Sequence, residues 1–97
     1  MRHPGHYYVY ILASKRHGTL YTDVTNDLPL RVSRHRNDVG SALTQKNGVH
    51  RLVWFELHDD VNAAIYREKC IKSRRRAWKL ALIEAINPYW DNLFEDL

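Results

Sequence analysis

Residues 7–13 form a short and almost unbroken run of β-branched and aromatic side chains, Tyr-Tyr-Val-Tyr-Ile-Leu-Ala. A run of this length and composition predicts a strand that is buried on both faces. The polar segment Ser14–Gly18 then predicts a hairpin loop, and Thr19–Thr25 predicts the partner strand. The chain is therefore expected to begin with an antiparallel hairpin.

A helix-start signal follows the hairpin at Asn26-Asp27-Leu28-Pro29. Asn or Asp can cap free backbone N–H groups, and proline is tolerated in the first turn of a helix. We expect this helix to reach about Asp38, with Leu28 and Val32 packed inward. The next segment, Gly40–Gly48, has no clear period and two glycines, so it predicts a loop.

The segment Arg51–Leu57 has the composition of a third strand. Asp59 or Asp60 can cap a helix that runs from about Val61 to Lys72. The residues expected to share one side of this helix are Ala64, Ile65 and Glu68.

Ser73 has the character of a fresh helix cap, and the helix after it is expected to reach about Ile86. Its apolar positions are Ala77, Leu80, Ala81 and Leu82. Asn87-Pro88 ends this helix. The acidic tail at 88–97 is expected to be a loosely packed end.

The predicted order is β-β-α-β-α-α, without the strand–helix alternation of a doubly wound sheet. It favours an α+β fold with a small, mostly antiparallel three-stranded sheet flanked by helices. A chain of 97 residues has room for one domain, here 1–97 with a core at about 7–87.

Charge and cysteine content narrow the classes of function. Lys and Arg outnumber Asp and Glu by 15 to 11, which favours a polyanionic partner. Cys70 is the only cysteine, so an internal disulfide and a multi-cysteine zinc cluster are excluded. No apolar run approaches the ~20 residues of a membrane span, and we expect a cytoplasmic protein that does not act at a membrane.

The candidates for a shared site on the predicted hairpin and helices are Tyr10, Tyr21, Arg31 and Glu68. Tyr10 and Tyr21 lie on neighbouring strands, and Asp23 shares the face of Tyr21. Arg31 follows on the first helix. Each also has an ordinary interpretation, as a cross-strand aromatic contact or a solvated charge. Glu68, on the later helix, is equally compatible with a surface ion pair.

The order and spacing of these residues resemble the GIY-YIG nuclease superfamily, in particular its small stand-alone bacterial members. The two name-giving motifs correspond to Tyr8-Val9-Tyr10 and Tyr21-Thr22-Asp23. Arg31 matches the family arginine, His35 the histidine one turn later, and Arg67–Lys72 the segment with the metal-binding glutamate. Two further similar segments are Val49–Glu56 and Asn87–Trp90, so that the resemblance covers about residues 7–93.

The resemblance implies a metal-dependent endonuclease acting on DNA. Tyr10 or Tyr21 would take a proton from the attacking water, and Arg31 would stabilise charge on the phosphate. Glu68 would hold one Mg²⁺ or Mn²⁺ with few other protein ligands. His35 would relay or orient, and Asn87 is a weaker candidate near the metal.

A basic segment at 67–79 carries seven Lys or Arg residues and only one acid, Glu68. It predicts a track for the phosphate backbone, with about half of its members serving only solubility. The residues assigned to nucleic-acid binding are Arg34, Lys69, Lys72, Arg74, Arg75 and Arg76. Targeting by a protein partner is a further expectation, and the oligomeric state is not readable.

Two positions depart from the family pattern. Asp23 replaces the glycine that usually ends the second motif, and its carboxylate would point at the phosphate site. Two like charges ~5 Å apart at an effective dielectric of ~20 repel by roughly 3 kcal/mol. Asp23 would therefore impair activity, or else recruit a second metal. Leu30 stands at the position where the small stand-alone members commonly have another arginine, directly before Arg31. A second hypothesis is thus a nucleic-acid-binding or interaction module that keeps the fold with little activity.

Overall fold

The computed structural model describes residues 6–36 and 48–97. Its three strands pair in the order β2-β1-β3, and both pairings are antiparallel. The elements are β1 (Tyr7–Ala13), β2 (Leu20–Thr25), α1 (Leu28–Arg36), β3 (Arg51–His58), α3 (Val61–Lys72), α4 (Arg76–Ile86) and the 3₁₀ helix η1 (Leu93–Asp96). This arrangement confirms the predicted α+β class and the element order.

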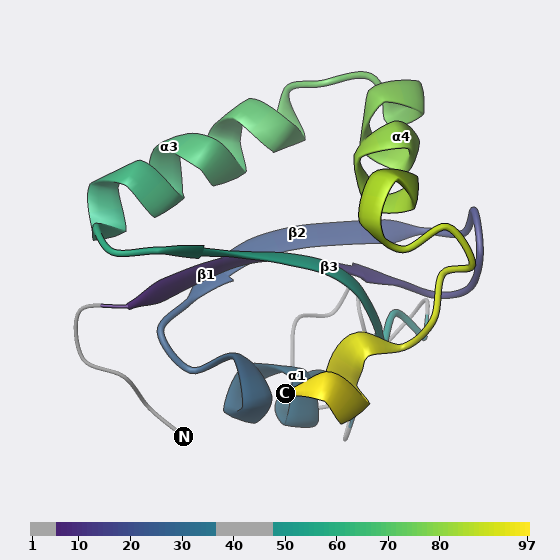
Figure 1. Ribbon diagram of the computed structural model, residues 1–97, viewed down its shortest axis with the longest axis horizontal. Coiled ribbons are helices and arrows are strands. Elements are labelled where there is room, and N and C mark those ends of the chain that lie inside the picture. Colours follow the sequence, from purple (N-terminus) through teal and green to yellow (C-terminus); the bar gives the residue numbers. More distant parts are fainter. Residues whose placement is uncertain (1–5, 37–47) are drawn as a thin grey trace.

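Helices cover both faces of the sheet, α3 and α4 on one side and α1 with η1 on the other (Figure 1). The central strand β1 is buried on both faces, because its residues from Val9 to Ala13 have no exposed surface. Val9 and Ile11 belong to the core under α3 and α4, whereas Tyr10 and Leu12 belong to the core over α1. The double burial read from the sequence is therefore confirmed.

Helix α1 begins where its start signal lies. The Asp27 Oδ1 atom accepts a hydrogen bond from the Leu30 N–H at 3.3 Å, and Leu28 and Val32 are fully buried. The predicted continuation to Asp38 and the predicted loop at 40–47 lie outside the described residues. Asp60 caps α3, because its Oδ2 atom accepts from the Ala63 N–H at 2.9 Å.

The prediction that Ser73 caps α4 is wrong. Ser73 ends α3 instead, where its hydroxyl donates to the Cys70 carbonyl at 2.8 Å and its N–H donates to the Lys69 carbonyl. Helix α4 begins at Arg76, with Arg75 as a cap that makes no side-chain bond. A serine satisfies backbone groups at either helix end, so its presence between two helices does not decide which of them it caps.

Ile65 is also placed differently from the expectation. Ala64 is buried in the core, but Ile65 is 39% exposed. Consecutive residues on a helix point about a quarter-turn apart or more, so only one of these two can face the sheet. Glu68 lies one turn after Ala64 and its side chain is mostly buried, at 12% exposure.

The C-terminal tail is an integral part of the fold, and its predicted loose packing is wrong. Trp90 is fully buried, and Leu93 and Phe94 pack against the core on the α1 side. Asn92 Oδ1 accepts from the Leu52 N–H at 3.2 Å, and Asn87 Nδ2 donates to the Val53 carbonyl at 3.0 Å. The tail thus satisfies backbone groups along the outer edge of β3.

The hairpin loop is fixed to α4 by polar contacts. The Arg76 guanidinium donates to the carbonyls of His17 and Gly18, both at 2.6 Å. The Glu84 carboxylate accepts from the Trp90 indole N–H and pairs with His17 Nε2, each at 2.8 Å. The bond from Trp90, and then that from His17, hold the pKa of the Glu84 carboxyl below its ordinary value. These contacts anchor β1 and β2 relative to α4.

Among residues 6–36 and 48–97, the structure contains no helix long and apolar enough to cross a membrane.

Candidate functional site

The register of the hairpin decides which polar side chains meet. Tyr10 lies directly opposite Asp23, and Tyr21 lies opposite Leu12. Residues opposite each other point to the same face, so Tyr10, Tyr21 and Asp23 all point to the α1 side. The two tyrosines are diagonal neighbours, with Asp23 directly across from Tyr10.

One oxygen of Asp23 joins the hairpin to α1. Its Oδ2 atom accepts the Tyr21 hydroxyl at 2.8 Å and pairs with an Arg31 guanidinium nitrogen at 3.3 Å. Its other oxygen, Oδ1, accepts from the Val24 N–H at 2.8 Å. The Asp23 and Arg31 side chains are partly exposed, at 29% and 38%. The partly exposed Asp23 carboxylate therefore accepts hydrogen bonds from both the Tyr21 hydroxyl and the Arg31 guanidinium at a single oxygen.

Tyr10 sits beneath this cluster and has no exposed surface. Burial raises the pKa of the Tyr10 hydroxyl far above its ordinary value, and the Asp23 carboxylate raises it further. The Arg31 guanidinium acts in the opposite direction and only partly offsets these effects. The protonated form of Tyr10 is strongly favoured as a result.

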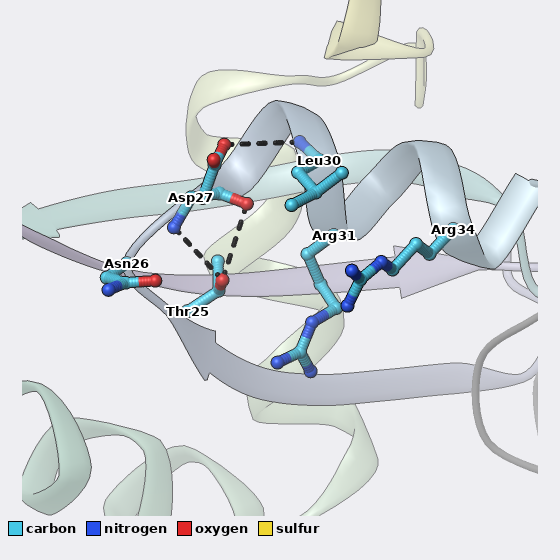
Figure 2. Close-up of a pocket in the computed structure, with 6 residues that line it drawn as sticks. All are labelled: Thr25, Asn26, Asp27, Leu30, Arg31 and Arg34. Atoms are coloured by element: carbon cyan, nitrogen blue, oxygen red, sulfur yellow. Dashed lines mark hydrogen bonds between the residues drawn. The ribbon is translucent and has the colours of Figure 1, made fainter. Parts of the chain in front are cut away.

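Arg31 reaches from α1 towards β2, whereas Arg34 extends along the helix (Figure 2). Both line an open pocket of about 250 Å³, and the other residues around it are Thr25, Asn26, Asp27 and Leu30. Leu30 is 48% exposed at its rim. His35 belongs to the last part of α1, but its side chain lies outside the described part of the structure.

Glu68 lies on α3, which covers the opposite face of the sheet from α1 (Figure 1). Its Oε2 atom pairs with Lys72 Nζ at 2.5 Å. Lys72 in turn lines a pocket at the free edge of β2, together with Tyr21. Glu68 is therefore linked to Tyr21 only indirectly, through Lys72 and the pocket at the edge of β2. Glu68 makes no direct contact with Asp23 or Arg31.

The chemistry available at Glu68 fits a hydrated divalent ion. Its carboxylate is a hard oxygen ligand of the kind that Mg²⁺ and Mn²⁺ bind. Within the described ranges, no three His, Cys, Asp or Glu side chains cluster closely enough to hold a metal together. An ion at Glu68 would keep several water ligands, as Mg²⁺ commonly does.

The basic segment divides into anchored and exposed members. Arg76 is committed to the hairpin carbonyls, and the Arg74 guanidinium lies 5.0 Å from the centre of the Trp78 ring. Lys69 and Arg75 are exposed. Lys79, the last basic residue of the predicted track, lines the same pocket as Lys72. Only the folding of α4 back over β2 brings it there.

Asn87 serves the fold at the edge of β3. Its Nδ2 atom donates to the carbonyls of Val53 and Asp91, and its Oδ1 atom accepts from the Asp91 N–H. The side chain is 4% exposed. With these bonds formed, Asn87 has a structural role that accounts for its buried amide.

Known proteins resemble the chain over most of its length. The family described as the GIY-YIG catalytic domain matches residues 6–81. A UPF0213 protein of Clostridium perfringens is 41% identical over 78 residues, which make up 80% of this chain and 83% of that protein. A UPF0213 protein of Haloquadratum walsbyi is 38% identical over 79 residues, covering 81% of this chain and 88% of that protein.

One solved structure has a similar fold. It is the solution NMR structure of a UPF0213 protein from Bacillus halodurans, with a TM-score of 0.56 and 29% sequence identity. The likeness covers 90% of this chain and 92% of that one. The matched family segment includes β1, β2, α1, β3 and α3, the elements that carry Tyr10, Tyr21, Arg31 and Glu68.

Proposed function

Because this chain belongs to the GIY-YIG catalytic-domain family, whose members are nucleases, we propose that it is a metal-dependent endonuclease that hydrolyses phosphodiester bonds in DNA. One observation carries the proposal. The Tyr21 hydroxyl and the Arg31 guanidinium both donate to a single anionic oxygen, Asp23 Oδ2. A non-bridging oxygen of a phosphate is also anionic, so it can take the place of this carboxylate oxygen as the acceptor for Arg31 beside Tyr21.

Phosphodiester hydrolysis needs a nucleophilic water, a base for its proton and positive charge near the phosphate. Arg31 supplies the positive charge and a planar donor fork for phosphate oxygens. It is only partly exposed, so a phosphate bound to it is partly withdrawn from water. The attraction between the guanidinium and the phosphate is stronger there than in bulk water. Arg31 is therefore the residue that stabilises the developing charge.

The surroundings of the two tyrosines favour Tyr21 as the base. Burial and Asp23 raise the pKa of Tyr10, so its phenolate is costly to form. Tyr21 is partly exposed at the sheet edge. A water molecule can reach Tyr21, whereas Tyr10 is enclosed. Tyr10 then supports the position of Arg31 from below.

Glu68 is the metal ligand in this proposal, and Mg²⁺ or Mn²⁺ is the ion. Because Glu68 lies on the α3 side of the sheet, a divalent ion held there would supply a Lewis acid for a phosphate that reaches the edge of β2 beside Lys72. Lys72, now paired with Glu68 at 2.5 Å, would be displaced from the carboxylate by that ion. His35 remains a proposed relay one turn after Arg31. A second ion at Asp23 is less well supported, because its oxygens already have three partners.

Contacts with DNA would come from the basic residues near the site. Arg34 lines the Arg31 pocket, and Lys69 and Arg75 are exposed on the face of α3 and α4. Arg76 holds the hairpin and Arg74 stacks on Trp78, so we assign these two a smaller share of the binding energy. Selection of particular DNA sites is left to a possible protein partner.

The direct test is cleavage of labelled DNA by the purified protein. We expect products from single-stranded or duplex DNA in the presence of Mg²⁺ or Mn²⁺, and none after the ion is chelated. Internal cleavage of a circular single strand would identify an endonuclease. If none of these substrates is cleaved with either ion, the proposed activity is wrong.

A second candidate function is a nucleic-acid-binding module with little activity. The observation that favours it is the same carboxylate, because Asp23 competes with a phosphate for Tyr21 and Arg31. Nucleic-acid binding without cleavage under all metal conditions would be its signature.

Replacing Asp23 by asparagine separates these candidates. The amide keeps the size and an acceptor oxygen but removes the negative charge. Since Asp23 is partly exposed and its charge is offset by Arg31, we expect about a tenfold gain in kcat/KM, corresponding to ~1.4 kcal/mol. Steady-state cleavage rates and Kd for DNA measure this gain. Asp27→Asn is the matched control, because Asp27 lies in the Arg31 pocket without pairing with Arg31. Equal effects of both substitutions would refute the competition argument.

A further inference from the structure

A second cationic pocket opens at the free edge of β2, on the side of the sheet covered by α3 and α4. Its volume is about 240 Å³, and its lining residues are Leu20, Tyr21, Thr22, Lys72 and Lys79. Pockets for drug-sized apolar ligands are larger, at ~300–1,000 Å³, and are lined mainly by hydrophobic side chains. Two ammonium groups in a small, open pocket favour a compact anion.

The two lysines come together from different helices. Lys72 is the last residue of α3, and Lys79 lies in the first turn of α4. The Lys79 Nζ atom donates to the Lys72 backbone carbonyl at 3.4 Å, which holds the Lys79 ammonium beside the C-terminal end of α3. The short connection between α3 and α4 therefore brings both lysines to this pocket.

The charges in the pocket are only half compensated. Lys72 pairs with Glu68, but within residues 6–36 and 48–97 Lys79 has no carboxylate within ion-pair distance. A cation on Glu68 would repel the Lys72 ammonium and leave both lysines to attract an anion. Loading the proposed metal site would thus strengthen this second pocket.

Tyr21 connects this pocket to the proposed catalytic site. It lines the lysine pocket, and its hydroxyl shares the Asp23 Oδ2 atom with Arg31. Arg31 belongs to α1 and the two lysines to α3 and α4, and these helices cover opposite faces of the sheet (Figure 1). The two cationic sites therefore lie on either side of the edge strand β2. A polyanion that crosses this edge meets both.

We propose that Lys72 and Lys79 form a second phosphate subsite, which binds a phosphate next to the cleaved one in the same nucleic-acid strand. This inference rests on the proposed nuclease function. It assigns Lys72 and Lys79 to one phosphate and adds a path for the strand. The strand crosses the edge of β2 with one phosphate at Arg31 and a neighbouring one at the lysines.

The salt dependence of binding tests this subsite, because each lost phosphate contact makes the negative slope of log K against log salt concentration shallower by about 1. Fluorescence anisotropy would follow a short labelled single strand and its duplex between ~50 and ~200 mM salt, with Ca²⁺ as the ion. The proteins are the full chain and its variants Lys79→Gln, Lys79→Arg and Lys15→Gln. Lys15 is an exposed lysine of the hairpin loop and serves as the matched control.

We expect Lys79→Gln to make this slope shallower by about 1 and to weaken binding about fivefold at ~0.1 M salt. Lys79→Arg should keep both values, and Lys15→Gln should change them by less than half as much. An unchanged slope in Lys79→Gln would overturn the subsite, and so would equal losses in the two glutamine variants, which indicate a diffuse surface field. If the unaltered chain binds neither probe, the proposed function fails as well. Thermal unfolding of each variant confirms that it is folded.

Discussion

Replacing Glu68 by glutamine is expected to lower metal-dependent cleavage about a thousandfold, which corresponds to ~4 kcal/mol of lost transition-state stabilisation. The amide is a neutral and weaker ligand for a hard divalent ion. Since Glu68 is the acidic residue proposed to hold this ion, its loss should also raise the Mg²⁺ or Mn²⁺ concentration needed for half-maximal rate. Cleavage rates measured across a metal titration test both effects.

Glu56→Gln is the matched control for this experiment. Glu56 lies on β3, pairs with Arg67 at 3.0 Å and is 36% exposed, so it is an ion-paired carboxylate outside the proposed site. We expect this variant to cleave at nearly the normal rate. A Glu68→Gln protein that cleaves normally, with an unchanged metal requirement, would show that Glu68 does not hold the metal.

Tyr21→Phe is expected to lower kcat about a hundredfold, within the range reported for loss of a general base. The matched substitution Tyr10→Phe should lower it less than about fivefold, because burial raises the pKa of the Tyr10 hydroxyl and keeps it protonated. Both changes remove one hydroxyl from the same face of the sheet. Single-turnover rates of the two variants compare their roles directly.

The pH dependence adds a second criterion. A phenol is mostly protonated at neutral pH, so a phenolate base makes cleavage faster as the pH rises. Tyr21→Phe should flatten this rise, and Tyr10→Phe should leave it in place. The reverse pattern would assign the base to Tyr10.

Much of the fold follows from local sequence patterns. The buried run at 7–13 and the alternation along β2 predict the hairpin and its faces. The cap at Asp60 is equally local. Ser73 could not be assigned from its sequence, because a serine between two helices can bond to either one. Trp90 and the tail depend on contacts with β3 and Glu84 that no local pattern encodes.

Part of the candidate site could also be predicted from local sequence patterns. Side-chain alternation places Tyr21 and Asp23 on one face, and the structure confirms that geometry. The register, however, sets Asp23 and not Tyr21 opposite Tyr10. Sequence spacing cannot fix a register to one residue. The roles of Arg76 and Lys79 were equally inaccessible, since they depend on how α4 folds back onto the hairpin and the edge of β2.

The two asparagines that bond to β3 also determine how the protein can be altered at its C-terminus. Exposed strand edges are templates for pairing with other chains. Asn87 and Asn92 occupy backbone groups of Val53 and Leu52, and Trp90 fills the adjoining core. A chain shortened to Ile86 would lose Asn87, Trp90 and Asn92. It would expose both the unpaired edge of β3 and a large apolar cavity. Such a truncated protein should aggregate during expression, although it would retain every residue of the proposed site.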